Sequence, residues 1–180
     1  MHNQIYAIGI TLVFLFALVG PAGATVFHTQ AEALALAFPD ADRFEKKTHI
    51  LGDQEVAAIE ARSRSSLPSR LVTIHSAYKG EDFLGYAHID VHTVRTKPEA
   101  FMVVLGPDAS VLQVKVLAFH EPLEYMPIPR WYQGFVGKGS DARLRVGYDI
   151  DAVTGATLTT RASAEGVRRM LAYYELLLKK

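Results

Sequence analysis

The spacing of apolar residues predicts two short helices before residue 70. Thr29-Gln30-Ala31-Glu32 has the spacing of a capping box, which predicts a helix that starts there and ends before Pro39. The expected apolar face of this helix contains Ala31, Leu34, Ala35 and Phe38. A second helical run extends from Asp53 to Arg64, and the segment 43–51 before it is compatible with a strand or a turn.

From Leu71 the apolar spacing becomes strand-like, and β-branched and aromatic residues become frequent. The expected strands are residues 71–76, 83–94, 99–105, 111–119 and 144–150. Short turns join the first four strands, so we expect them to form a largely antiparallel sheet. A C-terminal helix is expected from about residue 160 to residue 178, where apolar residues again recur at helical spacing. The pattern therefore predicts an α+β fold in which a largely antiparallel sheet packs against helices.

The two faces of the expected strand 83–94 differ in polarity. One face contains Leu84, Tyr86, His88, Asp90 and His92, and the other contains Phe83, Gly85, Ala87, Ile89 and Val91. We predict that the second face is buried and that the first faces solvent. His88, Asp90 and His92 could in principle share a metal ion, but their spacing along the strand favours an ordinary solvent-facing surface without a metal site.

Composition and charge narrow the function classes. The chain of 180 residues is 49% hydrophobic and 21% charged, which is typical of a globular domain. Its 19 basic and 19 acidic side chains give a formal net charge of zero, which argues against nucleic-acid binding. The absence of cysteine excludes disulfides, thiolate-ligated iron–sulfur clusters and attached c-type haem. Any redox centre of this chain must therefore be an organic cofactor or lack thiolate ligands.

Residues 1–24 have the pattern of a signal peptide. The apolar run from Ile5 to Val19 is followed by Ala22-Gly23-Ala24, an Ala-x-Ala site of the kind that signal peptidases cut. The run is shorter than the roughly 20 residues that a membrane span needs, which favours cleavage. Because no Lys or Arg precedes the run, an uncleaved membrane anchor stays an alternative. In both cases we expect the rest of the chain in the periplasm or another extracytoplasmic space.

A short motif just before the C-terminal helix carries the candidate chemistry. It is Asp151-Ala152-Val153-Thr154-Gly155-Ala156-Thr157, followed by Leu158. Gly155 permits a tight turn with a positive φ angle, and Ala156 leaves the approach uncrowded. The hydroxyl of Thr157 is then expected where the free backbone N–H groups and the dipole of a helix favour an anion. The pattern therefore predicts a site for a phosphate held at a threonine.

This motif resembles the flavinylation motif Asp-x-x-[Ser/Thr]-Gly-Ala-Thr of FMN-binding domains in the G subunit of the Rnf complex and the C subunit of the sodium-pumping NADH:quinone oxidoreductase. The resemblance implies that Thr157 carries FMN through a phosphoester bond, made by a dedicated flavin transferase that uses FAD as donor. Thr157 would then be the acceptor in another enzyme's reaction and not a catalytic nucleophile. The implied cofactor-binding residues of the motif are Asp151, Thr154, Gly155, Ala156, Thr157 and Leu158.

The resemblance also indicates a domain organisation. It covers roughly residues 71–178, so we expect an FMN-binding domain at 71–180. Residues 25–70 match nothing in this family and are expected to form an N-terminal helical segment, after the signal peptide or membrane anchor at 1–24.

The segment 120–139 resembles the family's loop that runs from a strand end through a turn containing Glu and Pro to a Trp, a Phe and a Gly-Lys. The residues that match it here are Glu121, Trp131, Phe135 and Lys138, and the resemblance implies that the flavin lies against this loop. The chain lacks the glycine-rich run that usually follows the Glu in the family, because Pro122-Leu123-Glu124-Tyr125 stands there.

Several roles stay open at this point. Trp131, Tyr132 and Phe135 either contact the flavin ring or simply pack a lid on the sheet. Lys138 either lies near a flavin oxygen or phosphate or is a solvated loop charge. Asp151 and Thr154 either position the acceptor hydroxyl or cap the turn.

The expected function is that of an exported flavoprotein. With FMN joined through its phosphate, the isoalloxazine ring stays free to carry electrons between redox proteins at the membrane or in the periplasm. One alternative is a flavin-dependent reductase of a small acceptor such as a quinone. Another is a non-redox regulatory or assembly module of an exported complex.

Overall fold

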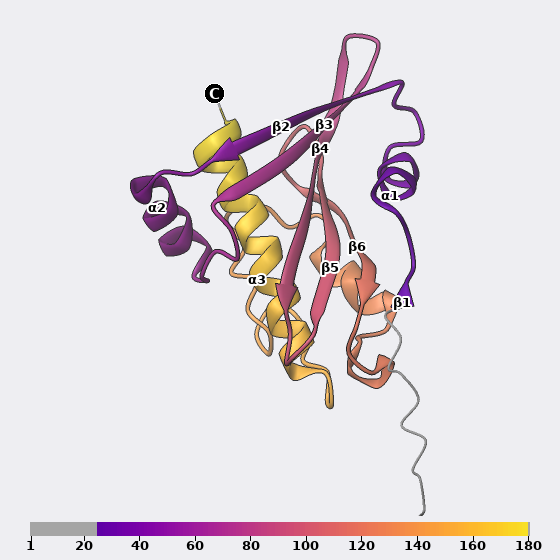
Figure 1. Cartoon of the computed structure of the whole chain (residues 1–180), viewed down its shortest axis with the longest axis vertical. Coiled ribbons are helices and arrows are strands. Elements are labelled where there is room, and N and C mark those ends of the chain that lie inside the picture. The colour runs from indigo at the N-terminus through magenta and orange to yellow at the C-terminus, as the bar shows by residue number, and fades with distance from the viewer. Residues whose placement is uncertain (1–24, 180) are drawn as a thin grey trace, which may run out of the picture.

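The computed structural model describes residues 25–179 (Figure 1). The predicted signal peptide or anchor at residues 1–24 lies outside the described residues. Within residues 25–179, no helix is both long enough and apolar enough to cross a membrane.

A six-stranded antiparallel sheet forms the centre of the fold. In spatial order its strands are β1 (Thr25–Val26), β6 (Val111–Phe119), β5 (Pro98–Leu105), β4 (Asp82–Thr93), β3 (Leu71–Lys79) and β2 (Arg43–Ile50). From β2 to β6, each strand pairs with the next one along the chain, and β1 pairs with β6. This arrangement confirms the predicted α+β class and the antiparallel sheet.

Helices cover both faces of the sheet (Figure 1). The helices are α1 (Gln30–Ala37), α2 (Asp53–Ser63) and α3 (Thr157–Tyr173), and a π-helical turn (Tyr174–Leu178) extends α3. On one face, α2 and α3 share a hydrophobic core with Phe101 and Val103 of β5. On the other face, α1 shares a second core with Met102 and Val104 of the same strand. Because alternate residues of a strand point to opposite faces, β5 is buried on both sides.

The N-terminal segment confirms some expectations and corrects another. The capping box between Thr29 and Glu32 is present, and α1 ends before Pro39. Its buried face, however, contains Ala33, Leu34 and Phe38 and not Ala31 or Ala35, which are exposed. Residues 43–50, expected as a strand or a turn, form the edge strand β2, which pairs with β3 over its whole length. The segment 25–70 therefore contributes strands to the main sheet as well as helices.

The strand expected at residues 144–150 does not form. The Asp149 carboxylate instead accepts hydrogen bonds from the backbone N–H groups of Leu144, at 2.8 Å, and Arg145, at 2.6 Å. These bonds close a compact turn, in which an isolated bridge between Val146 and Ile150 is the sole strand-like pairing. The alternating apolar residues Leu144, Val146 and Ile150 pack on the core from this turn, which explains why they resemble a strand in sequence.

The prediction that the polar face of β4 faces solvent is wrong, because α3 covers it. Asp90 is 1% exposed, and Arg169 of α3 donates two hydrogen bonds to its carboxylate, at 2.9 and 2.8 Å. The ring of His92 lies between Asp90, at 2.8 Å, and Glu99, at 3.2 Å. We call Asp90, His92, Glu99 and Arg169 the buried ionic cluster. Within residues 25–179, no group of three His, Asp or Glu side chains is placed to hold a metal ion.

Burial and hydrogen bonding compete in setting the pKa values of this cluster. Burial raises the pKa of Asp90, but hydrogen bonds from His92 and Arg169 outweigh it and hold the pKa well below its usual range. Burial lowers the pKa of His92, but hydrogen bonds to Asp90 and Glu99 outweigh it and raise the pKa to about 9. Burial also raises the pKa of Glu99. His92 is therefore a protonated, buried cation at neutral pH.

The raised pKa of His92 makes the stability of the fold depend on pH. The folded-state pKa of about 9 lies above the unfolded value of about 6.5. The stabilisation is therefore complete below about pH 6.5 and is lost as the pH rises through about 9, by up to about 3 kcal/mol. Urea unfolding between pH 6.5 and 9.5 should show this decline for the wild type and a flatter profile for His92→Phe. His120→Gln is the control and should keep the wild-type profile, because the His120 ring contacts the Pro98 carbonyl and no carboxylate. Equal slopes for the wild type and His92→Phe would contradict the assignment.

A close approach between α3 and the sheet depends on Gly166. A Cβ atom at this position would lie 2.3 Å from Cζ of Phe101 and 3.2 Å from Cγ of Asp90. We expect Gly166→Ala to lower the free energy of unfolding by about 1–3 kcal/mol through overpacking, although alanine is the better helix former. Gly134→Ala is the control, because an added Cβ there meets nothing within 4 Å. Equal urea midpoints for the two variants would show that α3 can shift away from β5 without cost.

Candidate functional site

The predicted motif forms a tight turn that leads directly into α3. Gly155 has a φ angle of 85°, the positive value that the sequence predicts. The helix begins at Thr157, no side chain caps it, and its first turn contains no acidic residue. Its first backbone hydrogen bond joins the N–H of Thr160 to the carbonyl of Ala156. The N–H groups of Thr157, Leu158 and Thr159 at the helix start therefore lack an intrahelical acceptor, which favours an anion at this position.

The four threonines of this region differ in how available their hydroxyl groups are. Thr159 is buried and donates to the Tyr125 carbonyl at 2.6 Å, and Thr160 is buried and donates to the Thr157 carbonyl at 3.0 Å. Thr154 and Thr157 are exposed, and of these two only Thr157 lines a cavity. Geometry alone therefore singles out Thr157 as the hydroxyl that a ligand in a cavity can reach.

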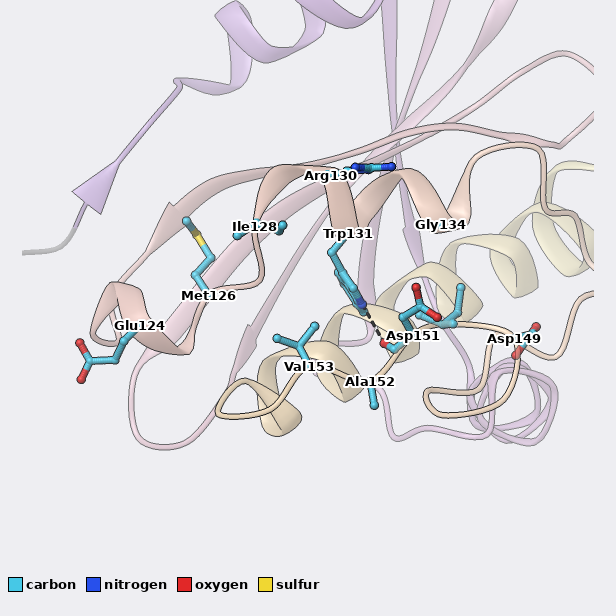
Figure 2. Close-up of a pocket in the computed structure, with 11 residues that line it drawn as sticks. Glu124, Met126, Ile128, Arg130, Trp131, Gly134, Asp149, Asp151, Ala152 and Val153 are labelled. Carbon is cyan, nitrogen blue, oxygen red and sulfur yellow. Dashed lines mark hydrogen bonds between the residues drawn. The ribbon is translucent and has the colours of Figure 1, made fainter.

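The larger of two cavities beside the motif has a volume of about 680 Å³ (Figure 2). Its walls come from the segments 124–134 and 149–153. The Trp131 indole N–H donates to the Asp151 carbonyl at 2.8 Å and so joins these two walls. Met126, Trp131 and Val153 supply apolar surface. The charged side chains in the lining are Glu124, Arg130, Asp149 and Asp151. A mostly apolar cavity of this size with a few polar groups is typical of a site for an organic cofactor.

The smaller cavity, of about 230 Å³, lies on the helix side of the same turn. It is lined by Arg95, Tyr125, Gly155, Ala156, Thr157, Leu158 and Thr159. Tyr125 belongs to the short 3-10 helix Leu123–Tyr125. The residues before and after Tyr125 in the chain, Glu124 and Met126, line the larger cavity. Both cavities are therefore lined by residues of the loop 124–126 and of the segment 149–159.

The structure separates the predicted residues of the segment 120–139. Trp131 lines the larger cavity, whereas Phe135 is 0% exposed in the hydrophobic core. Lys138 lines neither cavity, and its carbonyl accepts from the N–H of Val111 at 2.9 Å. Tyr132 is buried and forms an edge-to-face contact with Trp131. Core packing therefore accounts for Phe135 and Tyr132, and only Trp131 is placed for contact with a cofactor.

Glu121 holds a neighbouring turn and does not line either cavity. Its carboxylate accepts from the backbone N–H groups of Thr96, at 2.8 Å, and Lys97, at 3.0 Å. The hydrogen bond from the Thr96 N–H lowers the pKa of Glu121. Burial raises this pKa, and the hydrogen bond from the Lys97 N–H lowers it further. These bonds fix the turn between β4 and β5, whose first residues include Arg95. Glu121 therefore does not contact the smaller cavity but holds the turn from which Arg95 reaches it.

Two residues of the site carried no recognisable signal in the sequence. Arg95 reaches the smaller cavity from the β4–β5 turn, and its guanidinium lies 4.7 Å from the centre of the Tyr125 ring. Neither residue belongs to a motif, and 30 positions separate them in the chain, from 95 to 125. Only the antiparallel pairing of β4, β5 and β6 brings this turn next to the segment 120–125 and to the start of α3.

A protein-family match agrees with the cofactor site that the geometry indicates. Residues 97–172 match a family model described as the FMN-binding domain. This segment is an FMN-binding domain. It extends from β5 to near the end of α3 and contains every residue that the sequence predicts to bind the cofactor. The matched family supports FMN as the cofactor and so supports a flavoprotein.

Two curated proteins are similar in sequence to part of this chain. The regulatory protein NosR of Pseudomonas aeruginosa is 33% identical over 108 residues, which cover 51% of this chain and 15% of that protein. The regulatory protein NosR of Stutzerimonas stutzeri is 29% identical over 113 residues, which cover 53% of this chain and 16% of that protein. The chain therefore spans less than a fifth of the length of these relatives.

Proposed function

We propose that this chain is an exported flavoprotein in which FMN is attached through its phosphate to Thr157, and that it carries electrons between redox proteins at the membrane or in the periplasm. One observation carries the proposal. Within an FMN-binding domain, Thr157 places an exposed hydroxyl at the uncapped start of α3 and lines the smaller cavity, four residues after Val153, which lines the larger one.

The attachment chemistry needs an external enzyme and a donor. The Thr157 oxygen would attack the flavin-side phosphorus of FAD, the P–O–P bond would break, and AMP would leave as the Thr157 hydroxyl loses its proton. No step requires an oxidant or a reductant, since a phosphoester bond replaces a phosphoanhydride bond. The contribution of this chain is the exposed hydroxyl together with the free N–H groups of Leu158 and Thr159, which favour a phosphate at this position.

The larger cavity fits the flavin ring system. Its apolar residues Met126, Trp131 and Val153 suit a flat aromatic group, and its volume lies in the usual range for ligand sites. Attached FMN would supply one- and two-electron chemistry, and the protein would supply orientation and electrostatics. The Trp131–Asp151 hydrogen bond keeps the two walls of the cavity in place. We assign Asp151 and Thr154 to positioning the acceptor turn, and neither of them caps α3.

Exposed apolar side chains beside the cavities support a protein partner. Ile128 of the larger cavity is 68% exposed and Leu158 of the smaller one is 47% exposed, and Leu123 nearby is 52% exposed. Exposed apolar side chains gathered beside a site are typical of a docking surface. This arrangement favours an electron carrier over a reductase that encloses a small acceptor.

A regulatory or assembly role is the second candidate. The observation that favours it is the name of the two curated relatives, each called a regulatory protein. Under this alternative, the domain keeps its fold without using bound flavin, and the protein stays colourless when a flavin transferase is present.

Coexpression with a flavin transferase tests the proposal. If it is correct, the purified protein is yellow and its intact mass rises by one FMN less water, about 438 Da. A colourless protein of unchanged mass, from cells in which a known acceptor protein is flavinylated, would contradict the proposal and support the regulatory candidate.

A further inference from the structure

The smaller cavity has the charge pattern of an anion site. Among the described residues that line it, Arg95 is the only charged one, and none is acidic. The opposite wall is the first turn of α3, which has no capping side chain and no acidic residue. A cationic side chain and the positive end of a helix dipole thus line the same cavity, an arrangement that favours an anion between them.

Three interactions fix the position of Arg95. The Glu121 carboxylate holds the backbone of the next two residues, Thr96 and Lys97. The Arg95 guanidinium lies over the ring of Tyr125, at 4.7 Å from its centre. The carbonyl of Tyr125 in turn accepts from the Thr159 hydroxyl at 2.6 Å, which joins this loop to the first turn of α3. The β4–β5 turn, the 3-10 helix and α3 are therefore fastened together around the cavity.

We propose that Arg95 binds the phosphate of the flavin at Thr157, and that it does so both while the bond is made and in the finished protein. This inference rests on the proposed attachment at Thr157. A phosphodiester carries one negative charge, which matches one guanidinium and the free N–H groups of the helix start. Arg95 lies just before residues 97–172, so the family match itself does not include this residue.

The guanidinium is suited to this role by its chemistry. It is planar, permanently charged and able to donate two parallel hydrogen bonds to phosphate oxygens. A guanidinium over an aromatic ring keeps N–H groups at its edge for hydrogen bonds, and Arg95 lines the cavity. Neutralising the phosphate lowers the cost of bringing a dinucleotide such as FAD to Thr157. Arg95 is therefore expected to affect the rate of attachment as well as the environment of the attached phosphate.

The test compares charge-removing and charge-keeping variants of the full chain. Purified apoprotein is incubated with a flavin transferase and FAD, and the initial rate of flavin attachment is measured for the wild type, Arg95→Gln and Arg95→Lys. We expect Arg95→Gln to be about tenfold slower or more, as for the loss of a hydrogen bond to a charged group, and Arg95→Lys to lie much closer to the wild type. Arg161→Ala is the control, because Arg161 is an exposed cation in the same helix that lines neither cavity.

A second readout reports on the phosphate itself. The variants are loaded to completion by long incubation, and the ³¹P NMR resonance of the phosphodiester is recorded. The proposal expects a shifted resonance in Arg95→Gln and a wild-type resonance in Arg161→Ala. A structural role alone would slow loading and leave the resonance of fully loaded protein unchanged.

The outcomes separate this inference from the proposed function. If the wild-type protein does not acquire flavin, the proposed attachment at Thr157 is itself contradicted. Loading of the wild type and Arg95→Gln at the same rate, or an unchanged resonance in loaded Arg95→Gln, overturns the role of Arg95 and leaves the attachment standing. An equal loss in Arg95→Gln and Arg95→Lys would also overturn it, because the effect would then not depend on charge.

Discussion

We expect Thr157→Val to abolish covalent flavin attachment completely and Thr157→Ser to retain it. Valine has nearly the shape of threonine but no hydroxyl, so the nucleophile is lost while the turn and the start of α3 stay as they are. Serine keeps the hydroxyl at the same position. Thr159 and Thr160 cannot substitute, because both are buried and their hydroxyls are engaged with backbone carbonyls. Coexpression with flavin transferase, followed by intact mass measurement, compares the three proteins.

The stability of the variants supplies the control for this experiment. Thr157 is exposed and makes no capping hydrogen bond, so Thr157→Val should change the free energy of unfolding by no more than about 0.5 kcal/mol. A folded Thr157→Val protein that still gains the mass of the flavin would show that another residue is the acceptor. Loss of attachment in Thr157→Ser as well as in Thr157→Val would show that the methyl group matters as well as the hydroxyl.

The second large effect is expected in the buried ionic cluster. Asp90→Asn keeps the shape of the side chain but removes the charge that pairs with Arg169 and His92. Both cations are then left buried beside a neutral amide. Removing one partner of a buried pair typically costs about 3–5 kcal/mol, because the remaining charge has no compensation. We expect urea unfolding at pH 7 to show a loss of this size, and Arg169→Met to show a similar one.

Surface pairs of the same protein provide the comparison. Arg43 and Glu45 form an exposed ion pair on the edge strand β2. Glu45→Ala should cost less than about 1 kcal/mol, because exposed pairs are weak. If Asp90→Asn were no more destabilising than Glu45→Ala, the cluster would not hold α3 on the sheet as its hydrogen bonds indicate. The double variant Asp90→Leu with Arg169→Met should recover part of the loss, since neither charge is then left unpaired.

Local sequence patterns predicted the elements that depend on local interactions. The capping box of α1 and the hairpin between β5 and β6 are set by residues a few positions apart, and both form as expected. The turn at Gly155 is likewise determined by one residue and its immediate neighbours, and its positive φ was predictable.

Interactions between distant residues account for what the sequence did not reveal. The polar face of β4 was expected at the surface, but the partner of Asp90 is Arg169, 79 positions further along. Alternation of polar residues cannot show that a helix arrives later to pair with them. Arg95 was missed for the same reason, because only the folded sheet brings the β4–β5 turn to the start of α3. The strand expected at 144–150 failed because the Asp149 side chain satisfies the backbone locally.

The most direct test of Thr157 as the flavin acceptor is to locate the flavin within the chain. Trypsin cuts after Arg145 and Arg161, so one peptide, residues 146–161, contains Thr154, Thr157, Thr159 and Thr160. Fragmentation of this peptide from the flavin-loaded protein should place the added mass of about 438 Da on Thr157. Flavin mass on one of the other three threonines, or an unmodified peptide from yellow protein, would contradict the assignment of Thr157 as the acceptor.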